Sequence, residues 1–303
     1  MTPQRTLTTR TWIELFVLAF IWGAGFLAVR LAIDEVPIVT SVAHRVFWAA
    51  VILWAFVLVR GLPIPRDPKI WRALIVMGVL NNAIPFSLMA WGQLHIQTGL
   101  TSEFNAGTAI FGVVIAALIL ADERLTTPKI IGSAIGFFGV ATAIGLESVR
   151  NFDITSLAQL AVIAGTISYA FAGVWARINL TGLPPQVAAA GMLTGSSLVM
   201  VPAALLIDGT PSFDLSLTAL GAIGYYVVFA TAGAYLLYYR ILAAAGSANT
   251  MIVTLLIPPV SIILGALVLD ESLSPNVYIG LALLALGLAV LDGRVFKRLT
   301  RAS

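Results

Sequence analysis

The sequence has no cysteine and only two histidines, His44 and His95, among its 303 residues. A disulfide framework and a thiolate metal site are therefore excluded, and no His/Asp cluster has the spacing of a metal site. The chain also lacks a Gly-x4-Gly-Lys-Ser/Thr loop for nucleotide phosphates, a His-Glu-x-x-His zinc motif and a nucleophile elbow. We expect no cofactor and no catalytic residues, and therefore no enzyme.

Charge is scarce as well: charged residues make up 10% of the chain and hydrophobic residues 59%. Soluble domains carry about 25% charged residues, so this composition indicates a membrane protein. A membrane-spanning helix needs roughly 20 apolar residues. The apolar runs predict an all-α membrane protein with ten transmembrane helices, over about 12–31, 38–59, 71–91, 98–120, 128–146, 157–177, 186–206, 217–239, 247–269 and 275–291.

The distribution of Lys and Arg predicts the orientation of these helices. If the N-terminus lies on one side, all but three of the 17 Lys and Arg residues fall on that side. The exceptions are Arg30 and Arg150 on the opposite side and Arg45 within a span. By the positive-inside rule, we expect both termini to be cytoplasmic. The first apolar run has no small-residue cleavage site after it, so it is predicted to be a retained helix.

Two similar stretches indicate an internal duplication. Ala-Asp-Glu-Arg-Leu-Thr-Thr-Pro begins at Ala121 and Leu-Asp-Glu-Ser-Leu-Ser-Pro-Asn begins at Leu269, and glycines follow both at matched places. In each stretch a Ser or Thr precedes a proline (Thr127-Pro128, Ser274-Pro275), which predicts a helix start. Residues 1–150 and 151–303 are expected to be two five-helix repeats. Because five is odd, the second repeat enters the membrane from the opposite face, and inverted repeats of this kind are typical of transporters with a site near the midplane.

The chain resembles the drug/metabolite transporter superfamily, and more narrowly its EamA-type exporters. The resemblance rests on ten spans in two inverted repeats, an Arg early in the second span (Arg45), and the Asp-Glu-x-Leu-Ser/Thr corner followed by glycines. It covers the whole chain and is closest to bacterial YddG-type exporters of aromatic amino acids. The resemblance implies a multi-pass protein of the bacterial inner membrane that exports amino acids, chiefly aromatic or bulky apolar ones.

Polar and aromatic residues at helical spacing predict the faces that line the pathway. In the third span, Asn82 lies near the middle, with Phe86 one turn later. Asn82 is expected either to make an interhelical hydrogen bond or to contact substrate. Trp22 and Tyr169 lie at matched mid-span positions of the two repeats, too deep for an interfacial aromatic belt. In the eighth span we expect Tyr238 and Tyr239 to belong to that belt, with Tyr225 or Tyr226 at the mouth of the pathway.

The fourth and ninth spans are partner helices that also carry polar residues, with Asn105 in one and Thr254 in the other. The predicted substrate-binding residues are therefore Trp22, Asn82, Phe86, Asn105, Tyr169 and Thr254. Pro258 and Pro259 interrupt the backbone hydrogen bonds of the ninth span, which predicts a kink that acts as a gate or is only structural. The fourth span has no proline at the matched place, so it is expected to be straighter.

Two charged residues lie inside spans. Glu103 is the candidate for proton coupling; the alternative is a carboxylate in the outer vestibule that attracts cations. Arg45 is expected to have a structural role, with its charged end reaching outward. No Lys or Arg would then be available at mid-span to bind a phosphate group, which argues against phosphorylated sugars as substrates. Gly132, Gly136, Gly139, Gly280 and Gly287 suggest that the fifth and tenth spans form a scaffold, or a dimer contact.

The function expected from these observations is secondary transport of amino acids by alternating access. With no acid at the midplane, we expect facilitated diffusion. The alternative is broad-specificity drug or metabolite efflux, possibly proton-coupled through Glu103. The expected partners are a small-molecule substrate and membrane lipid, with no nucleic acid. The protein is expected to be a monomer, with a dimer possible.

Overall fold

A computed structural model describes residues 8–121, 126–150, 154–212, 214–245, 250 and 252–291. In this part of the chain every regular element is a helix, and no strand occurs. A helix lies over each of the ten predicted segments. The elements are α1 Thr9–Ile33, α2 Ile38–Val59, α3 Pro68–Gly78, η1 Val79–Ala83, α4 Ile84–Gly92, α5 Thr98–Ala106, α6 Thr108–Ile119, α7 Thr127–Arg150, α8 Ile154–Asn179, α9 Pro185–Ile207, α10 Leu217–Val227, η2 Val228–Gly233, α11 Ala234–Ala245, α13 Ile252–Leu269 and α14 Pro275–Leu291.

Side chains at the helix starts explain several of these bounds. Asp67 accepts a hydrogen bond from the backbone of Lys69 and is followed by Pro68 at the first helical position of α3. Ser216 accepts from the backbone of Ala219 at the start of α10. Both arrangements satisfy an amide that has no partner within the helix. The prediction that a helix begins at Pro275 is confirmed, whereas α7 already includes Thr127.

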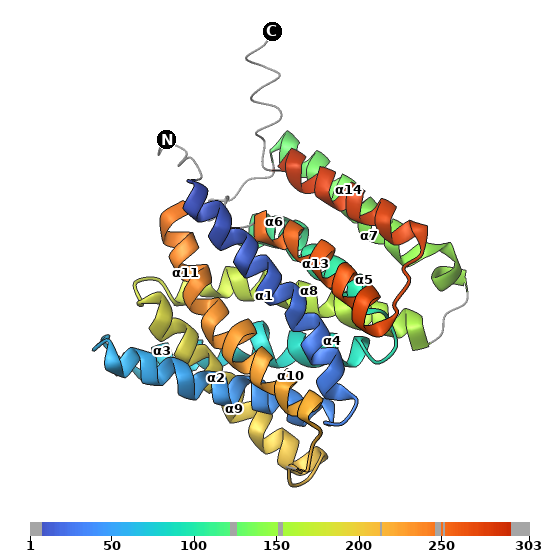
Figure 1. Cartoon of the computed structure of the whole chain (residues 1–303). Helices are drawn as coiled ribbons and strands as arrows, with labels where there is room; N and C mark the ends of the chain where they lie inside the picture. The colour runs from blue at the N-terminus through green and yellow to red at the C-terminus, as the bar shows by residue number, and fades with distance from the viewer. Residues whose placement is uncertain are drawn as a thin grey trace.

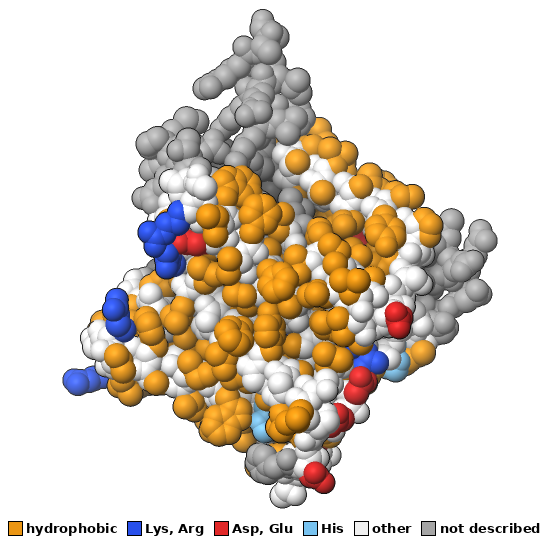
Figure 2. Space-filling model, in the orientation of Figure 1, with side chains coloured by type: hydrophobic (Ala, Val, Ile, Leu, Met, Phe, Trp, Pro, Cys, Tyr) orange, Lys and Arg blue, Asp and Glu red, His pale blue; other side chains and the backbone are white. Residues whose placement is uncertain are grey.

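Seven of the described helices are long and apolar enough to cross a membrane, counting α3–η1–α4, α5–α6 and α10–η2–α11 as one helix each. Leu256–Leu269 and Pro275–Val290 are shorter apolar helices. Figure 2 shows apolar side chains over the middle of one face, with most Lys and Arg at one edge and most Asp and Glu at the other. An apolar belt between charged ends is the surface that a multi-pass membrane protein needs.

Two of the helices contain a π-helical segment. η1 interrupts the helix from Pro68 to Gly92, and η2 interrupts the helix that begins at Leu217. The two segments occupy corresponding places in the third helix of each predicted repeat. π-Helical turns often occur at functional sites, because they free a carbonyl and change the direction of the side chains that follow.

One prediction about helix shape was wrong. The helix from Thr98 is not straight but divides at Gly107, whose N–H bonds the carbonyl of Phe104, three residues earlier. The glycine allows the hydrogen-bond pattern to tighten. In contrast, α13 is one continuous helix with Pro258 and Pro259 inside it, and the kink expected there stays a prediction.

The helices pack in a pattern that is nearly unchanged when the first and second halves are exchanged. α2 packs on α9, α7 on α14, and α5 on α13. Moreover, α1 packs on α13 as α8 packs on α6, and α3 packs on α9 as α10 packs on α2. In Figure 1, α7 and α14 lie side by side at the edge of the bundle, while α1 crosses in front of its centre. Each helix thus contacts elements that are far away in sequence.

The α7–α14 pair is packed through its glycines. A Cβ atom on Gly139 would lie 2.8 Å from the carbonyl oxygen of Gly280, and one on Gly287 would lie 2.7 Å from the carbonyl of Gly132. The backbones therefore approach as closely as small residues permit. This confirms the scaffold prediction for these glycines. The two glycine faces cover each other within one chain, and the alternative of a dimer stays a prediction.

The second of the repeated Asp-Glu corners directly precedes α14 in the chain. At the second corner, however, the Glu271 carboxylate accepts hydrogen bonds from the backbone of Thr98 and Gly99, at 2.8 and 3.4 Å. Glu271 therefore caps α5, a helix of the first half, where the carboxylate also meets the positive end of the helix dipole. The first corner, Asp122-Glu123, lies outside the described residues.

Candidate functional site

A cluster of polar and aromatic side chains lies where the two π-helical segments face the centre of the bundle. Its members come from both halves of the chain: Trp22 on α1, Arg45 on α2, Asn81 and Asn82 in η1, Phe86 on α4, Tyr169 on α8, Ser196 on α9, Tyr226 on α10, Thr231 in η2, and Tyr235 and Tyr238 on α11. We call this set the central cluster. It contains four of the six predicted substrate-binding residues.

Asn82 is fully buried and bonds neighbouring helices. Its Nδ2 donates to the Ser196 hydroxyl at 2.8 Å, and its Oδ1 accepts from the Tyr235 hydroxyl at 3.0 Å. Asn81 is only half-buried and also donates to the Tyr235 oxygen, at 3.3 Å. Asn82 therefore makes the interhelical hydrogen bond that was one of the two predicted roles, and it fixes Tyr235 in the cluster. Its contact with substrate stays a prediction.

Trp22 connects α1 to the second π-helical segment. Its indole N–H donates to the carbonyl oxygen of Ala230 at 3.2 Å, and its ring lies 5.8 Å from the ring of Tyr238. Tyr238 is half-buried on α11, and its place relative to the membrane interface stays a prediction. The two rings form part of an apolar wall, while the indole N–H has the buried partner that it needs.

Arg45 turns inward rather than outward. Its Nε donates to the hydroxyl of Thr231 at 2.9 Å, and its Cζ lies 3.8 Å from the centre of the Phe86 ring. The guanidinium is also close enough to the phenol oxygens of Tyr169, Tyr226 and Tyr235 to interact with them electrostatically. The prediction that its charged end reaches the outer surface was wrong, because the Phe86 face and the Thr231 hydroxyl hold it inside.

Thr231 owes its position to the π-helical geometry of η2. Its hydroxyl donates to the carbonyl oxygen of Tyr226, five residues earlier, at 2.7 Å. Because this hydroxyl hydrogen is used by Tyr226, the Thr231 oxygen can accept the hydrogen bond that Arg45 Nε donates. Tyr226 is fully buried and bonds Ser41, one turn before Arg45 on α2. These contacts join α2 of the first half to α10 and η2 of the second.

Three predicted substrate residues, Tyr169 in the central cluster and Asn105 and Thr254 outside it, are half-buried. Tyr169 is half-buried on α8 and packs against apolar residues of both main cores. Asn105 is half-buried near the break at Gly107, and its amide has no hydrogen-bond partner among the described residues. Thr254 is half-buried on α13. The structure does not test whether these side chains contact a substrate.

The predicted gate lies where α13 meets α1. Pro258 is buried and Pro259 is exposed. Just beyond them, Val260 packs so closely on α1 that a Cβ on Gly23 would lie 2.7 Å from its side chain. The proline pair therefore adjoins a tight contact between the two halves.

Glu103 lies away from the central cluster. It is fully buried, and both carboxylate oxygens lack a hydrogen-bond partner in the described part of the chain. A Cβ on Gly280 would lie 2.7 Å from its Oε1, so the carboxyl faces α14. The vestibule interpretation was wrong, because the side chain is closed off by the α7–α14 pair. No group of His, Asp and Glu suited to a metal occurs among the described residues.

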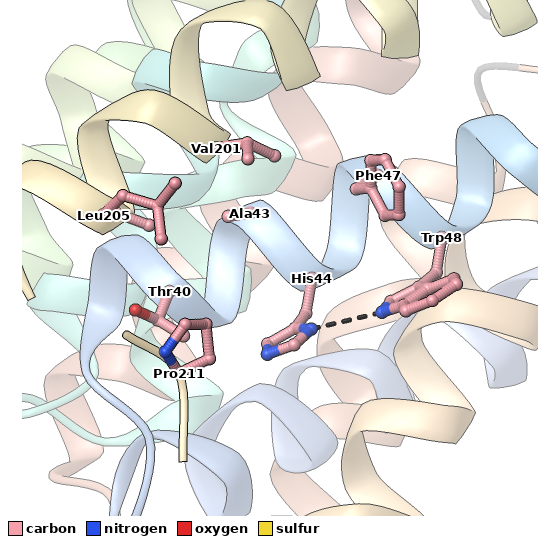
Figure 3. Close-up of a pocket in the computed structure, with 9 residues that line it drawn as sticks. Thr40, Ala43, His44, Phe47, Trp48, Val201, Leu205 and Pro211 are labelled. Carbon is pink, nitrogen blue, oxygen red and sulfur yellow. Dashed lines mark hydrogen bonds between the residues drawn. The ribbon is translucent and has the colours of Figure 1, made fainter. Parts of the chain in front are cut away.

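A separate groove of about 180 Å³ lies between α2 and α9, lined by Thr40, Ala43, His44, Phe47, Trp48, Val201, Ala204, Leu205 and Pro211. In Figure 3, the Trp48 indole points toward His44, and its N–H donates to Nδ1 at 3.2 Å. Phe47 and Trp48 are exposed on the outside of the bundle. The groove is therefore an apolar surface feature rather than part of the central cluster.

Sequence reasoning missed the inward role of Arg45, Thr231 and Tyr235. One signal was present: Thr231, Tyr235 and Tyr238 are spaced by four and three residues, which places them on one helical face. The partner of Arg45 could not be found in this way, because Thr231 belongs to the other half of the chain.

Comparison with known proteins gives a consistent result. The model of the EamA-like transporter family matches this chain twice, over residues 11–145 and 156–291. A transporter of Archaeoglobus fulgidus is 25% identical over 93% of this chain and 98% of its own length. A probable terminal-alkyne amino-acid exporter of Streptantibioticus cattleyicolor is 25% identical over 93% of both chains.

A probable amino-acid metabolite efflux pump of Escherichia coli is 22% identical over 89% of this chain and 90% of its own length. One crystal structure, of a protein 18% identical in sequence, has a TM-score of 0.66 and covers 93% of this chain and 97% of the other. This likeness concerns the fold. The two matched segments together span most of the residues, and the chain belongs to the EamA-like transporter family.

Proposed function

We propose that this protein exports amino acids, chiefly aromatic or bulky apolar ones, across the bacterial inner membrane by facilitated diffusion. Membership of a transporter family is the main support. The printed names of two relatives, an amino-acid exporter and an amino-acid metabolite efflux pump, favour amino acids as the substrate class. The aromatic preference is supported by the composition of the central cluster, where Trp22, Phe86, Tyr169 and Tyr238 offer flat apolar faces.

The architecture proposed for this function is ten transmembrane helices in two inverted repeats, 1–150 and 151–303. Three observations support it: the family model matches once in each half, η1 and η2 occupy corresponding places, and the packing is nearly unchanged on exchanging the halves. Inverted repeats place the substrate site where the halves meet. The central cluster has this position, since its side chains come from both halves.

In the proposed mechanism, the two halves rock about the central cluster and open it to one side of the membrane at a time. Substrate contacts are proposed for Trp22, Asn82, Phe86, Asn105, Tyr169 and Thr254. The close contact of Val260 with Gly23 is proposed to open and close next to Pro258 and Pro259. A proline pair suits a gate, because the missing backbone hydrogen bonds lower the cost of bending α13.

The proposed orientation has both termini in the cytoplasm. It is supported by the charge distribution, in which most Lys and Arg lie at one edge of the molecule and most acidic residues at the other (Figure 2). α1 begins and α14 ends on the same side in Figure 1, as an even number of spans requires.

Broad-specificity efflux coupled to protons through Glu103 is the competing function. The carboxyl of Glu103 faces Gly280, beside the α7–α14 pair, rather than the aromatic residues that would hold a cationic drug. This placement favours facilitated diffusion without a coupled proton.

The test is counterflow of labelled L-phenylalanine into proteoliposomes without a pH gradient. We expect uptake by the wild type and a loss of about tenfold or more in Tyr169→Ala, because the flat apolar contact is removed. A dye and a sugar serve as comparison solutes. A strict requirement for a proton gradient would overturn facilitated diffusion. Absence of amino-acid flux alongside dye flux would favour the efflux alternative.

A further inference from the structure

Arg45 carries a positive charge into the interior of the bundle without an acidic partner. It lies about two turns inside α2, and within the described residues no carboxylate pairs with its guanidinium. Removing a charged side chain from water is costly unless the charge is paired or well hydrogen-bonded. The charge of Arg45 is therefore left without a counter-ion among the described residues.

The surroundings of Arg45 leave one part of the guanidinium open. Nε is occupied by the Thr231 hydroxyl at 2.9 Å, and one face is covered by the Phe86 ring at 3.8 Å. The terminal nitrogens, Nη1 and Nη2, have no acceptor among the described residues. These two nitrogens form a planar fork whose spacing matches the two oxygens of a carboxylate.

The neighbouring groups restrict the class of anion. The side chains that interact electrostatically with the guanidinium are the phenols of Tyr169, Tyr226 and Tyr235, and none of them adds a second positive charge. A phosphate dianion carries two negative charges and would need more than one cation, whereas a carboxylate carries one charge and can be bound by a single guanidinium. Phe86 and Tyr169 provide apolar area next to this fork.

We propose that Arg45 receives the carboxylate of the transported solute through Nη1 and Nη2, and so selects carboxylates over neutral or purely cationic analogues. This inference rests on the proposed transport function and names the chemical group that its site recognises. The Phe86 ring and the Thr231 hydroxyl act as positioning groups, because they hold the guanidinium plane at a fixed angle. Since Thr231 belongs to η2, carboxylate binding also joins the two halves.

The test compares L-phenylalanine with L-phenylalaninamide, which has the same side chain and amine but no carboxylate. Both are used as competitors of labelled L-phenylalanine counterflow. In the wild type we expect L-phenylalanine to compete at roughly 10- to 100-fold lower concentration than the amide, which is the range for a hydrogen-bonded charge. In Arg45→Gln this advantage should disappear, and Arg45→Lys should keep only part of it, because Lys lacks the fork.

Arg60→Gln is the matched control. Arg60 lies at the end of the same helix, over Phe56 at 5.9 Å, but is exposed. It should keep the full preference for the carboxylate. An equal effect of both competitors on the wild type, or an unchanged preference in Arg45→Gln, would overturn the proposal while leaving amino-acid transport intact.

Failure of the proposed function gives a different result, in which the wild type carries no amino acid. The role of Arg45 is then tested by ligand binding alone. The thermal midpoint of the purified protein is measured with 3-phenylpropionate and with 3-phenylpropanamide, and the two shifts are compared. Stabilisation by the carboxylate only, reduced in Arg45→Lys, would support the inference, and equal shifts would reject it. Should Arg45→Gln fail to fold, the wild-type competition and Arg45→Lys decide between the same outcomes.

Discussion

The central cluster and the α7–α14 pair bury their backbones and polar groups by different means. In the central cluster, Asn82, Thr231 and Tyr235 each bond a side chain or carbonyl of another element, at 2.7–3.0 Å. Along α7 and α14, glycine meets glycine with no side chain between the backbones. Beside that pair lies the buried carboxyl of Glu103, whose oxygens have no hydrogen-bond partner among the described residues.

This difference indicates that the central cluster is suited to movement and the α7–α14 pair to structural support. Hydrogen bonds between helices in a membrane contribute about 0.6 kcal/mol each on average, so a network of them can be exchanged for another at small cost. Backbones in van der Waals contact have a single close arrangement, because any rotation brings a larger residue into the seam. We therefore expect the central cluster to rearrange during transport and the α7–α14 pair to move as a unit.

The largest effect is expected for Gly280→Val. Its Cβ would lie 2.7 Å from the carbonyl oxygen of Gly139 and 2.7 Å from Glu103, so the helices must separate. Overpacking of this kind costs roughly 1–3 kcal/mol, and the backbone contact places this variant at the upper end. Thermal unfolding in detergent should show a clear fall in the midpoint.

Gly112→Val on α6 is the matched control, since a Cβ on Gly112 meets nothing within 4 Å. It should leave the midpoint nearly unchanged. If both valines lowered the midpoint equally, the α7–α14 pair would be no more tightly packed than an open helix face, and the comparison between the two regions would fail.

A smaller loss of stability is expected for Asn82→Ala in the central cluster. Removing the amide breaks the bonds to Ser196 and Tyr235, which corresponds to about 0.6–1.7 kcal/mol for interhelical bonds of this kind. Counterflow of L-phenylalanine should fall much more than stability does, because Tyr235 loses the group that orients it. The two readouts are initial counterflow rate and thermal midpoint on the same preparation.

Asn81→Ala is the neighbouring control. Asn81 is half-buried and makes longer contacts, at 3.3 Å to the Tyr235 hydroxyl and 3.3 Å to the sulfur of Met192. Its loss of stability should be smaller than that of Asn82→Ala. A larger loss of stability in Asn81→Ala would show that Asn81, and not Asn82, makes the hydrogen bond that stabilises the cluster.

Much of the helical arrangement was predictable, because the signals that determine it are local. Apolar runs of sufficient length, the Ser274-Pro275 helix start and the matched glycines all depend on neighbouring residues. The interhelical hydrogen bond of Asn82 was also predictable, since a polar group at mid-span needs a partner.

The direction of Arg45 and the burial of Glu103 could not be predicted in the same way. A helix in a membrane has apolar residues toward lipid and toward its neighbours, so hydropathy does not distinguish its two faces. Arg45 turns inward because Thr231 and Phe86 lie there, and Glu103 is closed off because Gly280 lies against it. Both contacts depend on how distant helices pack. The π-helical segments likewise have no composition that marks them in the sequence.

The smallest effect is expected for Glu103→Gln. A charged carboxylate without a partner in this position would cost several kcal/mol, so we expect Glu103 to be uncharged in the folded protein. Glutamine has nearly the same shape and no charge, and it should change both the thermal midpoint and L-phenylalanine counterflow only slightly. Measuring both from pH 6 to pH 8 checks whether the wild type and the variant keep the same profile.

Glu271→Gln provides the contrast, because Glu271 lies between α13 and α14 and accepts two backbone N–H groups at the start of α5, the helix that carries Glu103. Loss of a helix cap costs about 0.5–2 kcal/mol, so this variant should lose more stability than Glu103→Gln. A loss of counterflow in Glu103→Gln, or a pH dependence that the variant abolishes, would show that Glu103 carries a proton during transport. The α5–α7–α14 region would then take part in the cycle rather than support it, and facilitated diffusion would give way to coupled efflux.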